Sequence, residues 1–181
     1  KRILGVELYP AEAQKASEKG GQIICNDFFA QCEDGLGEKR FDAVVGNPPF
    51  IRYQDFDEEY RSSAFDLMRR YGFSPNRLTN IWLPFLDVCC HLLTDEGRLG
   101  MVIPAELFQV KYAAETRRFL MDFFESVTIV TFAELLFDGA QQEVILLLAQ
   151  RSAADGEQGV RIVEMRNAGS LMETSPESIA R

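Results

Sequence analysis

The sequence predicts an α/β fold in which a mostly parallel sheet carries helices on its faces. Short apolar runs alternate with longer amphipathic segments, which is typical of parallel strands joined by crossover helices. A short glycine-containing link between the last two apolar runs favours an antiparallel hairpin at the end of the sheet. The 181 residues are enough for one domain with a full core and short for two.

The first elements form a strand, a helix and a second strand. Residues 2–7 ("RILGVE") and 22–25 ("QIIC") are the expected strands. The helix between them, over 10–19, starts at Pro10, which suits a first helical turn, and stops at two glycines. Residues 30–40 are expected to form a loop or a short irregular helix.

A proline inside a later helix needs an explanation. If Asn80 is the N-cap, Pro84 lies in the first turn, where backbone N–H groups lack helical partners. The "DEG" sequence at 95–97 predicts a turn before the following strand. The later elements are expected, in order, as a strand at 41–46, helices at 57–72 and 80–93, a strand at 98–103 ending at Pro104, a helix at 111–125, and strands at 126–132 and 143–150.

Composition excludes several classes of protein. No apolar stretch approaches the roughly 20 residues that span a bilayer, and the amino-terminal residues do not resemble a signal peptide. The four cysteines form no Cys-x-x-Cys pair and His91 is the only histidine, so a zinc site is disfavoured and Cys89, Cys90 and His91 are expected in the core. We therefore expect a cytoplasmic protein with reduced thiols. The net charge of −9 argues against a complete nucleic-acid binder.

Polar side chains follow each of the first three expected strands. Glu7 ends the first strand, Asp27 follows the second and Asn47 follows the third. In an open parallel sheet, ligands bind beyond the carboxyl ends of the strands. For Glu7 or Asp27 alone, a loop residue or a helix cap is the preferred explanation, whereas three such residues in succession, one of them inside "NPPF", favour a binding site.

The two carboxylates suggest an adenosine site. An acidic residue at a strand end can accept hydrogen bonds from both ribose hydroxyls, a role suited to Glu7. Asp27 could accept from an adenine amine while Phe28 covers the ring. No glycine-rich phosphate loop with lysine is present, so ATP has little support.

The "NPPF" sequence is the most specific feature. Its two prolines end the preceding strand and stiffen the turn. The side-chain oxygen of Asn47 and the carbonyl of Pro48 are acceptors that can aim at one point, and Phe50 can stack beside them. This arrangement suits an amino group on a planar system.

Five segments together carry a family resemblance: "GVELYP", "NDFF", "DAVVGNPPF", "GRLGMVIPAELF" and "LLFDGAQQEVILLL". In this order they resemble the N6-adenine DNA methyltransferases of restriction–modification systems, which carry Asn-Pro-Pro-Tyr/Phe and use S-adenosylmethionine (SAM). The resemblance covers about residues 3–150.

The resemblance assigns a role to each candidate residue. It places Glu7 at the cofactor ribose and Asp27 and Phe28 at the cofactor adenine. It places the target amine at Asn47 and Pro48, with Phe50 stacked on a flipped base. Pro49 belongs to the same substrate site. Phe137 is matched to a second aromatic residue against that base, although an ordinary core phenylalanine explains it equally well.

The implied reaction is direct methyl transfer to an adenine that has left the duplex. Stacking on an aromatic ring offsets part of the cost of unstacking the base. Hydrogen bonds from N6 to Asn47 and Pro48 favour the nucleophilic form of the amine and the charge that develops on it.

The sequence also departs from the family. The family's glycine-rich cofactor motif, on a central strand before "GVELYP", has no counterpart, and neither does a target-recognition domain. Residues 1–150 are thus expected to be a partial catalytic domain lacking its first strand, with SAM binding impaired in isolation. The 41–46 strand should pair with the 2–7 strand or leave a gap. Residues 151–181 should be a linker or edge strand toward an absent domain.

The expected partners are double-stranded DNA, bound through regions outside this chain, and a restriction or specificity subunit, with no membrane. An RNA or protein-glutamine methyltransferase would use the same amine chemistry, and a non-catalytic module that assembles with partner subunits is a third alternative. The arginine- and aromatic-rich segment 51–80 favours a large nucleic-acid substrate, or else is a solvated helix face.

Overall fold

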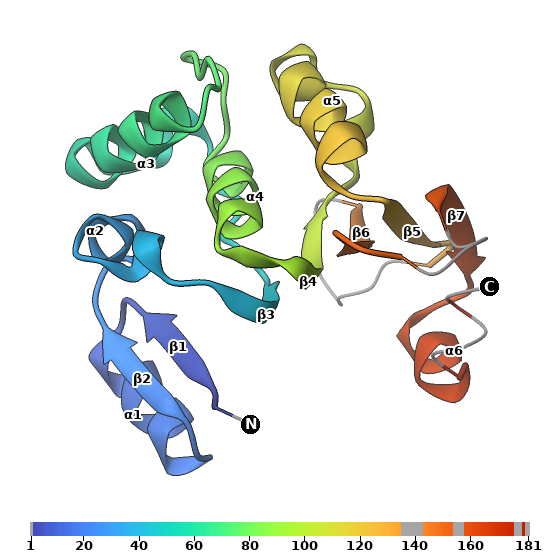
Figure 1. Ribbon diagram of the computed structural model, residues 1–181, viewed down its shortest axis with the longest axis horizontal. Coiled ribbons are helices and arrows are strands. Elements are labelled where there is room, and N and C mark those ends of the chain that lie inside the picture. Colours follow the sequence, from blue (N-terminus) through green and yellow to red (C-terminus); the bar gives the residue numbers. More distant parts are fainter. Residues whose placement is uncertain (1, 135–142, 154–157, 176–178, 180–181) are drawn as a thin grey trace.

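The computed structural model describes residues 2–134, 143–153, 158–175 and 179 (Figure 1). Within these residues the strands form two separate sheets. In the first sheet, β1 (Leu4–Glu7) pairs in parallel with β2 (Gln22–Cys25). The crossover between them is α1 (Pro10–Glu18), which has proline at its first position and is followed by glycines at positive φ. The predicted strand–helix–strand unit is confirmed.

The second sheet has five strands in the order β3-β4-β6-β5-β7. β3 pairs in parallel with β4 and β5 with β7, whereas β6 is antiparallel to both β4 and β5. The predicted hairpin and the carboxy-terminal edge strand are therefore present. The strands are β3 (Phe41–Gly46), β4 (Leu93–Pro104), β5 (Ser126–Phe132), β6 (Val144–Gln150) and β7 (Gly159–Met165).

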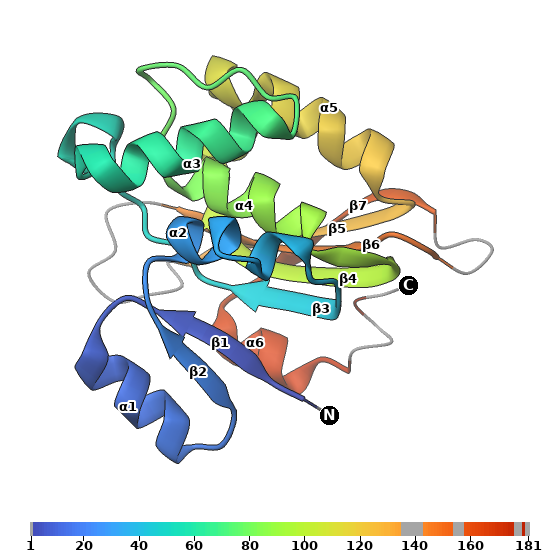
Figure 2. The same cartoon turned by 60° about the vertical axis from the view of Figure 1, so that its left-hand side comes forward.

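Helices cover both faces of this sheet. Figure 2 shows the central helices on one face and the last helix on the other, beside β7. The helices after α1 are α2 (Phe28–Glu33), α3 (Glu58–Arg70), α4 (Trp82–His91), α5 (Ala114–Phe123) and α6 (Ala168–Glu173). Short 3₁₀ turns, such as η3 (Ala105–Phe108) and η4 (Lys111–Ala113), join several elements.

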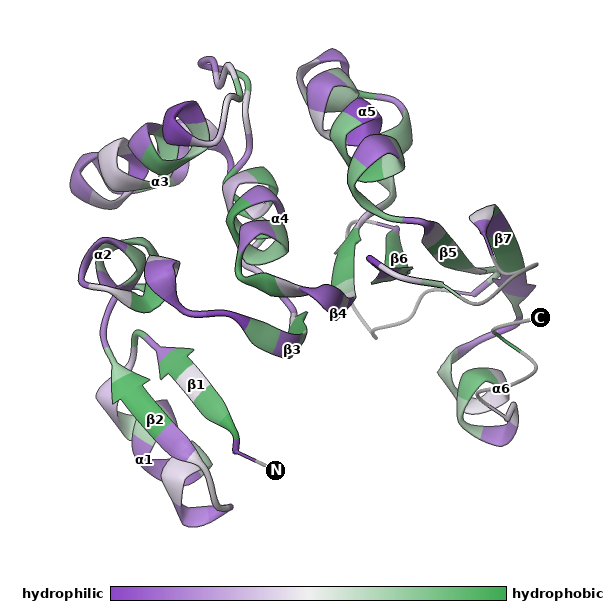
Figure 3. Cartoon of the chain, in the orientation of Figure 1, coloured by the Kyte–Doolittle hydropathy of each residue, from purple (hydrophilic) through white to green (hydrophobic). Residues whose placement is uncertain are grey.

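The core is centred on α4 and the strands beneath it. Trp82, Leu86 and Cys90, four residues apart, are fully buried, as are Ile103 of β4 and Leu147 of β6. Such spacing places these side chains on one helix face toward the sheet. Hydrophobic colour accordingly concentrates on α4 and the strands (Figure 3). The predicted core position of Cys89 and Cys90 is confirmed.

A gap separates the two sheets at β1 and β3. Of the two outcomes expected for the 41–46 strand, the structure adopts the gap, because β1 is bonded only to β2 in the described part of the chain. Val45 of β3 is 81% exposed although it lies within a strand. Both strands thus carry an unpaired edge, an arrangement that proteins normally cover.

Two local expectations were wrong. The N-cap of α4 is Ile81 rather than Asn80, although Pro84 does lie in the first turn. The "DEG" sequence lies within β4 as an irregularity, since Phe41 pairs with Leu93 but Ala43 pairs with Arg98. The tail contains the edge strand β7 and, after it, the short helix α6.

Candidate active site

The predicted polar residues lie at the same end of the strands. In Figure 2 the arrowheads of β1, β2 and β3 point to one side, which is the carboxyl edge of the sheets. Glu7 ends β1, Asp27 lies two residues beyond β2 and Asn47 directly follows β3. The gap between β1 and β3 separates Glu7 from Asn47 within this edge. Phe137 lies outside the described residues.

Glu7 and Asp27 both make local hydrogen bonds. Glu7 accepts from the backbone N–H of Tyr9 through Oε1 at 3.0 Å. Asp27 is 8% exposed and caps α2, with Oδ1 accepting from the N–H of Ala30 at 2.8 Å. Each contact occupies one carboxylate oxygen. Asp27 is therefore a helix cap, as one of the two explanations predicts, and a ligand would have to donate a hydrogen bond to its other oxygen, Oδ2.

Phe28 belongs to an aromatic cluster at the start of α2. Its ring stacks on Phe85 with centroids 5.0 Å apart and an interplanar angle of 17°. It also meets the edge of Phe29 at 5.3 Å. Because Phe85 covers one face of the Phe28 ring, an adenine would have to pack against the opposite face.

The "NPPF" turn exposes an amide beside a partly buried ring. Asn47 is exposed, and its amide forms no hydrogen bond with the residues that the structure describes. Pro48 is buried, Pro49 is exposed and Phe50 is half-buried against the core. The side-chain amide of Asn47 therefore has its hydrogen-bonding capacity open to a ligand.

The chain after the turn is held in place by α4 and by an arginine. The backbone N–H of Ile81 donates to the carbonyl of Ile51 at 3.1 Å. Arg61 donates to the carbonyls of Tyr53 and Phe56 at 3.0 and 3.2 Å, and its guanidinium lies 4.2 Å over the Tyr53 ring. These contacts fix the segment that follows Phe50.

Glu106 is the most connected side chain at this edge, and sequence reasoning missed it. It lies in η3, just past the end of β4, and its Oε1 accepts from Asn80 Nδ2 at 3.0 Å, Trp82 Nε1 at 2.8 Å and the hydroxyl of Tyr112 at 2.8 Å. Burial and the Glu106 carboxylate raise the pKa of Tyr112. An acid after a strand-ending proline, at the edge that carries Asn47, was the available signal.

Comparison with known protein families identifies the family of this chain. The model of the Eco57I restriction-modification methylases matches residues 7–137, more than half of the chain. The chain belongs to this methylase family. The matched range contains Glu7, Asp27, Asn47 and Glu106.

Individual relatives are consistent with the family. The chain is 30% identical over 100 residues to the type II methyltransferase M.BstVI of Geobacillus stearothermophilus, covering 55% of this chain and 17% of that protein. It therefore spans only a small part of the length of this relative.

Solved structures show that the fold is that of SAM-dependent methyltransferases. A Listeria monocytogenes protein described as a class I SAM-dependent methyltransferase matches with a TM-score of 0.55 and 13% identity, over 98% of this chain and 61% of that one. The protein of the DrdV–DNA complex matches with a TM-score of 0.65 and 14% identity, over 92% of this chain and 21% of that one.

Most arginines of the segment 51–80 of this methylase chain are engaged internally. Arg61 has a side chain only 17% exposed, Arg69 pairs with Asp66, and Arg70 pairs with Glu33. Two further arginines of the segment, Arg52 and Arg77, are exposed and make no ion pair with any described residue. Of the arginines in this segment, Arg52 and Arg77 are therefore the two that are available for the predicted contact with a nucleic acid.

The titratable groups of α4 lie away from the carboxyl edge. Asp87 is fully buried, and burial raises the pKa of its carboxyl group. Its Oδ2 accepts from the Thr116 hydroxyl at 3.1 Å, whereas Oδ1 has no hydrogen-bond partner in the part of the chain that the structure describes. His91 stacks between Tyr71 and Phe119, with centroids 3.9 and 5.2 Å away, and burial lowers its pKa. We assign both residues to packing.

No group of metal ligands and no helix long and apolar enough to cross a membrane occurs among the described residues.

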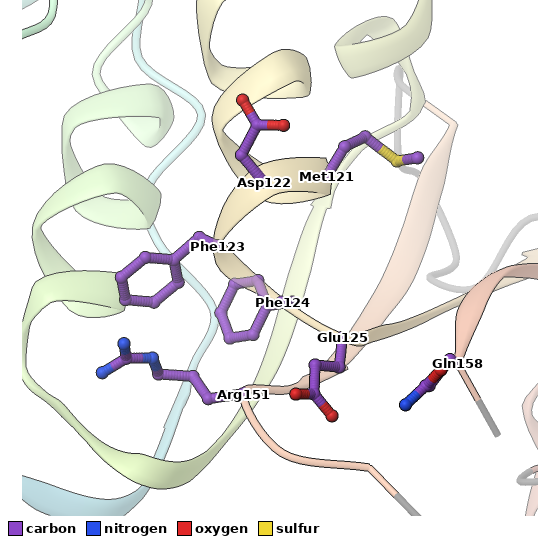
Figure 4. A pocket seen from close by; sticks show the side chains of 7 residues that line it. All are labelled: Met121, Asp122, Phe123, Phe124, Glu125, Arg151 and Gln158. Atoms are coloured by element: carbon purple, nitrogen blue, oxygen red, sulfur yellow. The ribbon is translucent and has the colours of Figure 1, made fainter. Parts of the chain in front are cut away.

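A hollow of about 530 Å³ lies at the amino end of β5, opposite the carboxyl edge that carries Asn47 (Figure 4). Arg151 at its rim pairs with Asp95 at 2.7 Å and lies 4.3 Å over the Phe123 ring. This hollow is remote from Asn47.

Proposed function

We propose that this chain is part of a DNA adenine N6-methyltransferase of a restriction–modification system, which uses SAM. In this proposal the chain binds the adenine amine that becomes methylated. The observation that carries the proposal is the exposed, unengaged amide of Asn47 on a proline-stiffened turn at the carboxyl edge of β3. Membership of the Eco57I methylase family supports it.

Asn47 and Pro48 act on the amine through hydrogen bonds. The lone pair of adenine N6 is delocalised into the ring, so the amine is a weak nucleophile. Two acceptors that accept hydrogen bonds from its two N–H groups favour the tetrahedral form of the amine, in which the lone pair is free to attack the methyl group. They also stabilise the positive charge that develops on N6 before its proton leaves to water. No strong base is required.

Phe50 supplies the surface on which the base rests. An adenine inside a duplex cannot reach Asn47, so the base must leave the stack. Stacking on the half-buried Phe50 ring offsets part of that cost and orients N6 toward Asn47. Pro49, next to Phe50, is part of the same proposed surface for the base.

The cofactor half of the site would use Glu7, Asp27 and Phe28. When bound, SAM supplies an activated methyl group. Glu7 would accept hydrogen bonds from the ribose hydroxyls through the carboxylate oxygen that does not bond to Tyr9, and Asp27 would accept one from the adenine amine through Oδ2. We further propose that a strand outside residues 1–181 occupies the gap between β1 and β3 and completes this half.

Methyl transfer by the whole protein tests the proposal. Labelled SAM is offered with unmethylated duplex DNA, with RNA or with a protein mixture, and Asn47→Ala is compared with Asn167→Ala, an asparagine that caps the distant α6. We expect label in DNA, its loss with Asn47→Ala alone, and N6-methyladenine after digestion. Label in RNA or protein would select the alternative substrates, and no transfer to any substrate would select a non-catalytic module.

A further inference from the structure

A tight turn at Asn76–Thr79 stands beside the proposed site. Asn76 Oδ1 accepts from the N–H of Leu78 at 2.8 Å, and the Thr79 hydroxyl accepts from the N–H of Asn76 at 3.0 Å. The N–H of Thr79 donates back to the carbonyl of Asn76 at 3.0 Å, and Thr79 is 1% exposed. A turn closed by its own side chains holds one shape before any partner arrives.

The turn presents two exposed side chains, Arg77 and Leu78. Leu78 is 72% exposed, which is high for a leucine on an otherwise ordered turn. Arg77 is exposed and makes no ion pair or hydrogen bond with the described residues. The turn thus carries an apolar and a cationic side chain at neighbouring positions, both exposed, on a backbone that its own hydrogen bonds hold.

Backbone contacts place the turn next to the "NPPF" segment. Two residues after Thr79, the N–H of Ile81 bonds to the carbonyl of Ile51, which directly follows Phe50. Asn80, between them, bonds to Glu106. At the other end of the connection, the N–H of Ser74 donates to Glu115 at 2.8 Å, so the segment is anchored on both sides.

The cations at this edge contrast with the acidic chain. The net charge is −9, yet Arg52, Arg77 and Lys111 are exposed without an ion pair in the described ranges. Arg52 lies two residues after Phe50, and Lys111 precedes Tyr112, which shares Glu106 with Asn80. Each of these three cations can bind a phosphate of a polyanion.

We propose that the Asn76–Thr79 turn is a contact for duplex DNA, in which Arg77 binds a backbone phosphate and Leu78 packs into the duplex beside the extruded adenine. The proposal rests on the proposed function, because it needs a base held at Asn47. Leucine is among the residues that proteins insert beside unstacked bases, and arginine binds phosphate through its planar fork.

Two variants and two matched controls test the contact by duplex binding of the whole protein, measured by anisotropy of a fluorescein-labelled mixed-sequence DNA over a range of salt. Arg77→Ala should weaken binding several-fold and lower the salt slope by about one. Arg77→Lys should restore most of the slope, since a phosphate contact needs the charge. Leu78→Glu should weaken binding further, because its carboxylate would face phosphates.

The controls carry the same changes at the opposite end of the sheet. Arg98, exposed and paired by register with Ala43 and Gln150, is changed to alanine, and Met121, 57% exposed on α5, is changed to glutamate. Both should bind as the unaltered protein does. Equal losses in variants and controls would overturn the proposal, as would unchanged binding in Arg77→Ala and Leu78→Glu or a loss confined to an RNA hairpin.

Methyl transfer measured on the same preparations separates the two proposals. If Asn47→Ala loses transfer but Arg77→Ala and Leu78→Glu bind duplex normally, the turn contact is wrong and the proposed function stands. If the unaltered protein binds duplex without transferring methyl, the proposed function fails, and the contact fails with it. Support requires transfer by the unaltered protein together with weakened duplex binding in both turn variants.

Discussion

Removing the Glu106 carboxylate should destabilise the carboxyl edge measurably. In Glu106→Ala, the Trp82 indole N–H, the Asn80 amide and the Tyr112 hydroxyl all lose their acceptor. Asn80 and Tyr112 are half-buried and can turn to water, whereas Trp82 is fully buried. A buried donor left unpaired costs about 1–3 kcal/mol, so we expect a total loss of about 3 kcal/mol in the free energy of unfolding.

The assay can follow the site itself. Trp82 is the only tryptophan of the 181 residues, so its fluorescence during denaturant unfolding reports on this cluster. Glu106→Gln keeps a neutral acceptor at the same place and should lose only about 1 kcal/mol. It should also lower the pKa of Tyr112, because the charge on Glu106 contributes to the raised value.

A matched control is Glu134→Ala, which removes an exposed carboxylate bonded to Arg166 and Asn167. Exposed pairs of this kind contribute little. If Glu106→Ala unfolds at the same denaturant concentration as the unaltered chain and as Glu134→Ala, the three hydrogen bonds do not support the edge, and the reasoning is refuted.

Three further predictions concern the core and the backbone. Because Asp87 has a raised pKa in the folded chain, its contribution to stability is present below the unfolded value near 3.8 and is lost as pH rises. Asp87→Asn should therefore raise the free energy of unfolding at neutral pH by about 1 kcal/mol or more in denaturant titrations. A lower free energy of unfolding in this variant would contradict the prediction. A Cβ at Gly97 would lie 2.7 Å from Leu93 Cβ and 2.9 Å from the Thr94 carbonyl, whereas at Gly100 the nearest atom is 3.5 Å away; Gly97→Ala should therefore lower Tm more than Gly100→Ala, and equal effects would be inconsistent with the close approach. Cys25 is exposed while Cys32, Cys89 and Cys90 are buried with raised thiol pKa values; a thiol reagent should modify one cysteine rapidly in the folded chain, and rapid modification of more than one would argue against this packing.

The fold was predictable where local pattern and topology agree. The elements 2–7, 10–19 and 22–25 were identified from apolar runs, Pro10 and the paired glycines, because each signal lies within the element itself. The irregular pairing of β4 was not predictable, since "DEG" has the chemistry of a turn and yet lies within β4, between Leu93 and Arg98, which pair with Phe41 and Ala43 of β3.

The site was predictable in its residue types and less so in its contacts. Asn47 could be singled out because the two prolines make its turn unusual. Glu106 follows a strand-ending proline, but its contacts could not be predicted, because two of its partners are 24 and 26 residues away in the chain. Arg61 could not be singled out either, because its importance lies in a partner 8 residues away. A sequence shows which groups are present at an edge, whereas only the folded chain shows which of them share a partner.

The central claim is that Asn47 accepts a hydrogen bond from the amine that becomes methylated. Its most direct test is the rate of N6-methyladenine formation in duplex DNA by the whole protein at saturating SAM, compared between unaltered protein and Asn47→Ala. Loss of one acceptor that acts on the developing charge should lower kcat by about 10²-fold or more while duplex binding is retained. Methylation at an unchanged rate, or at a different atom of the base, would contradict the account.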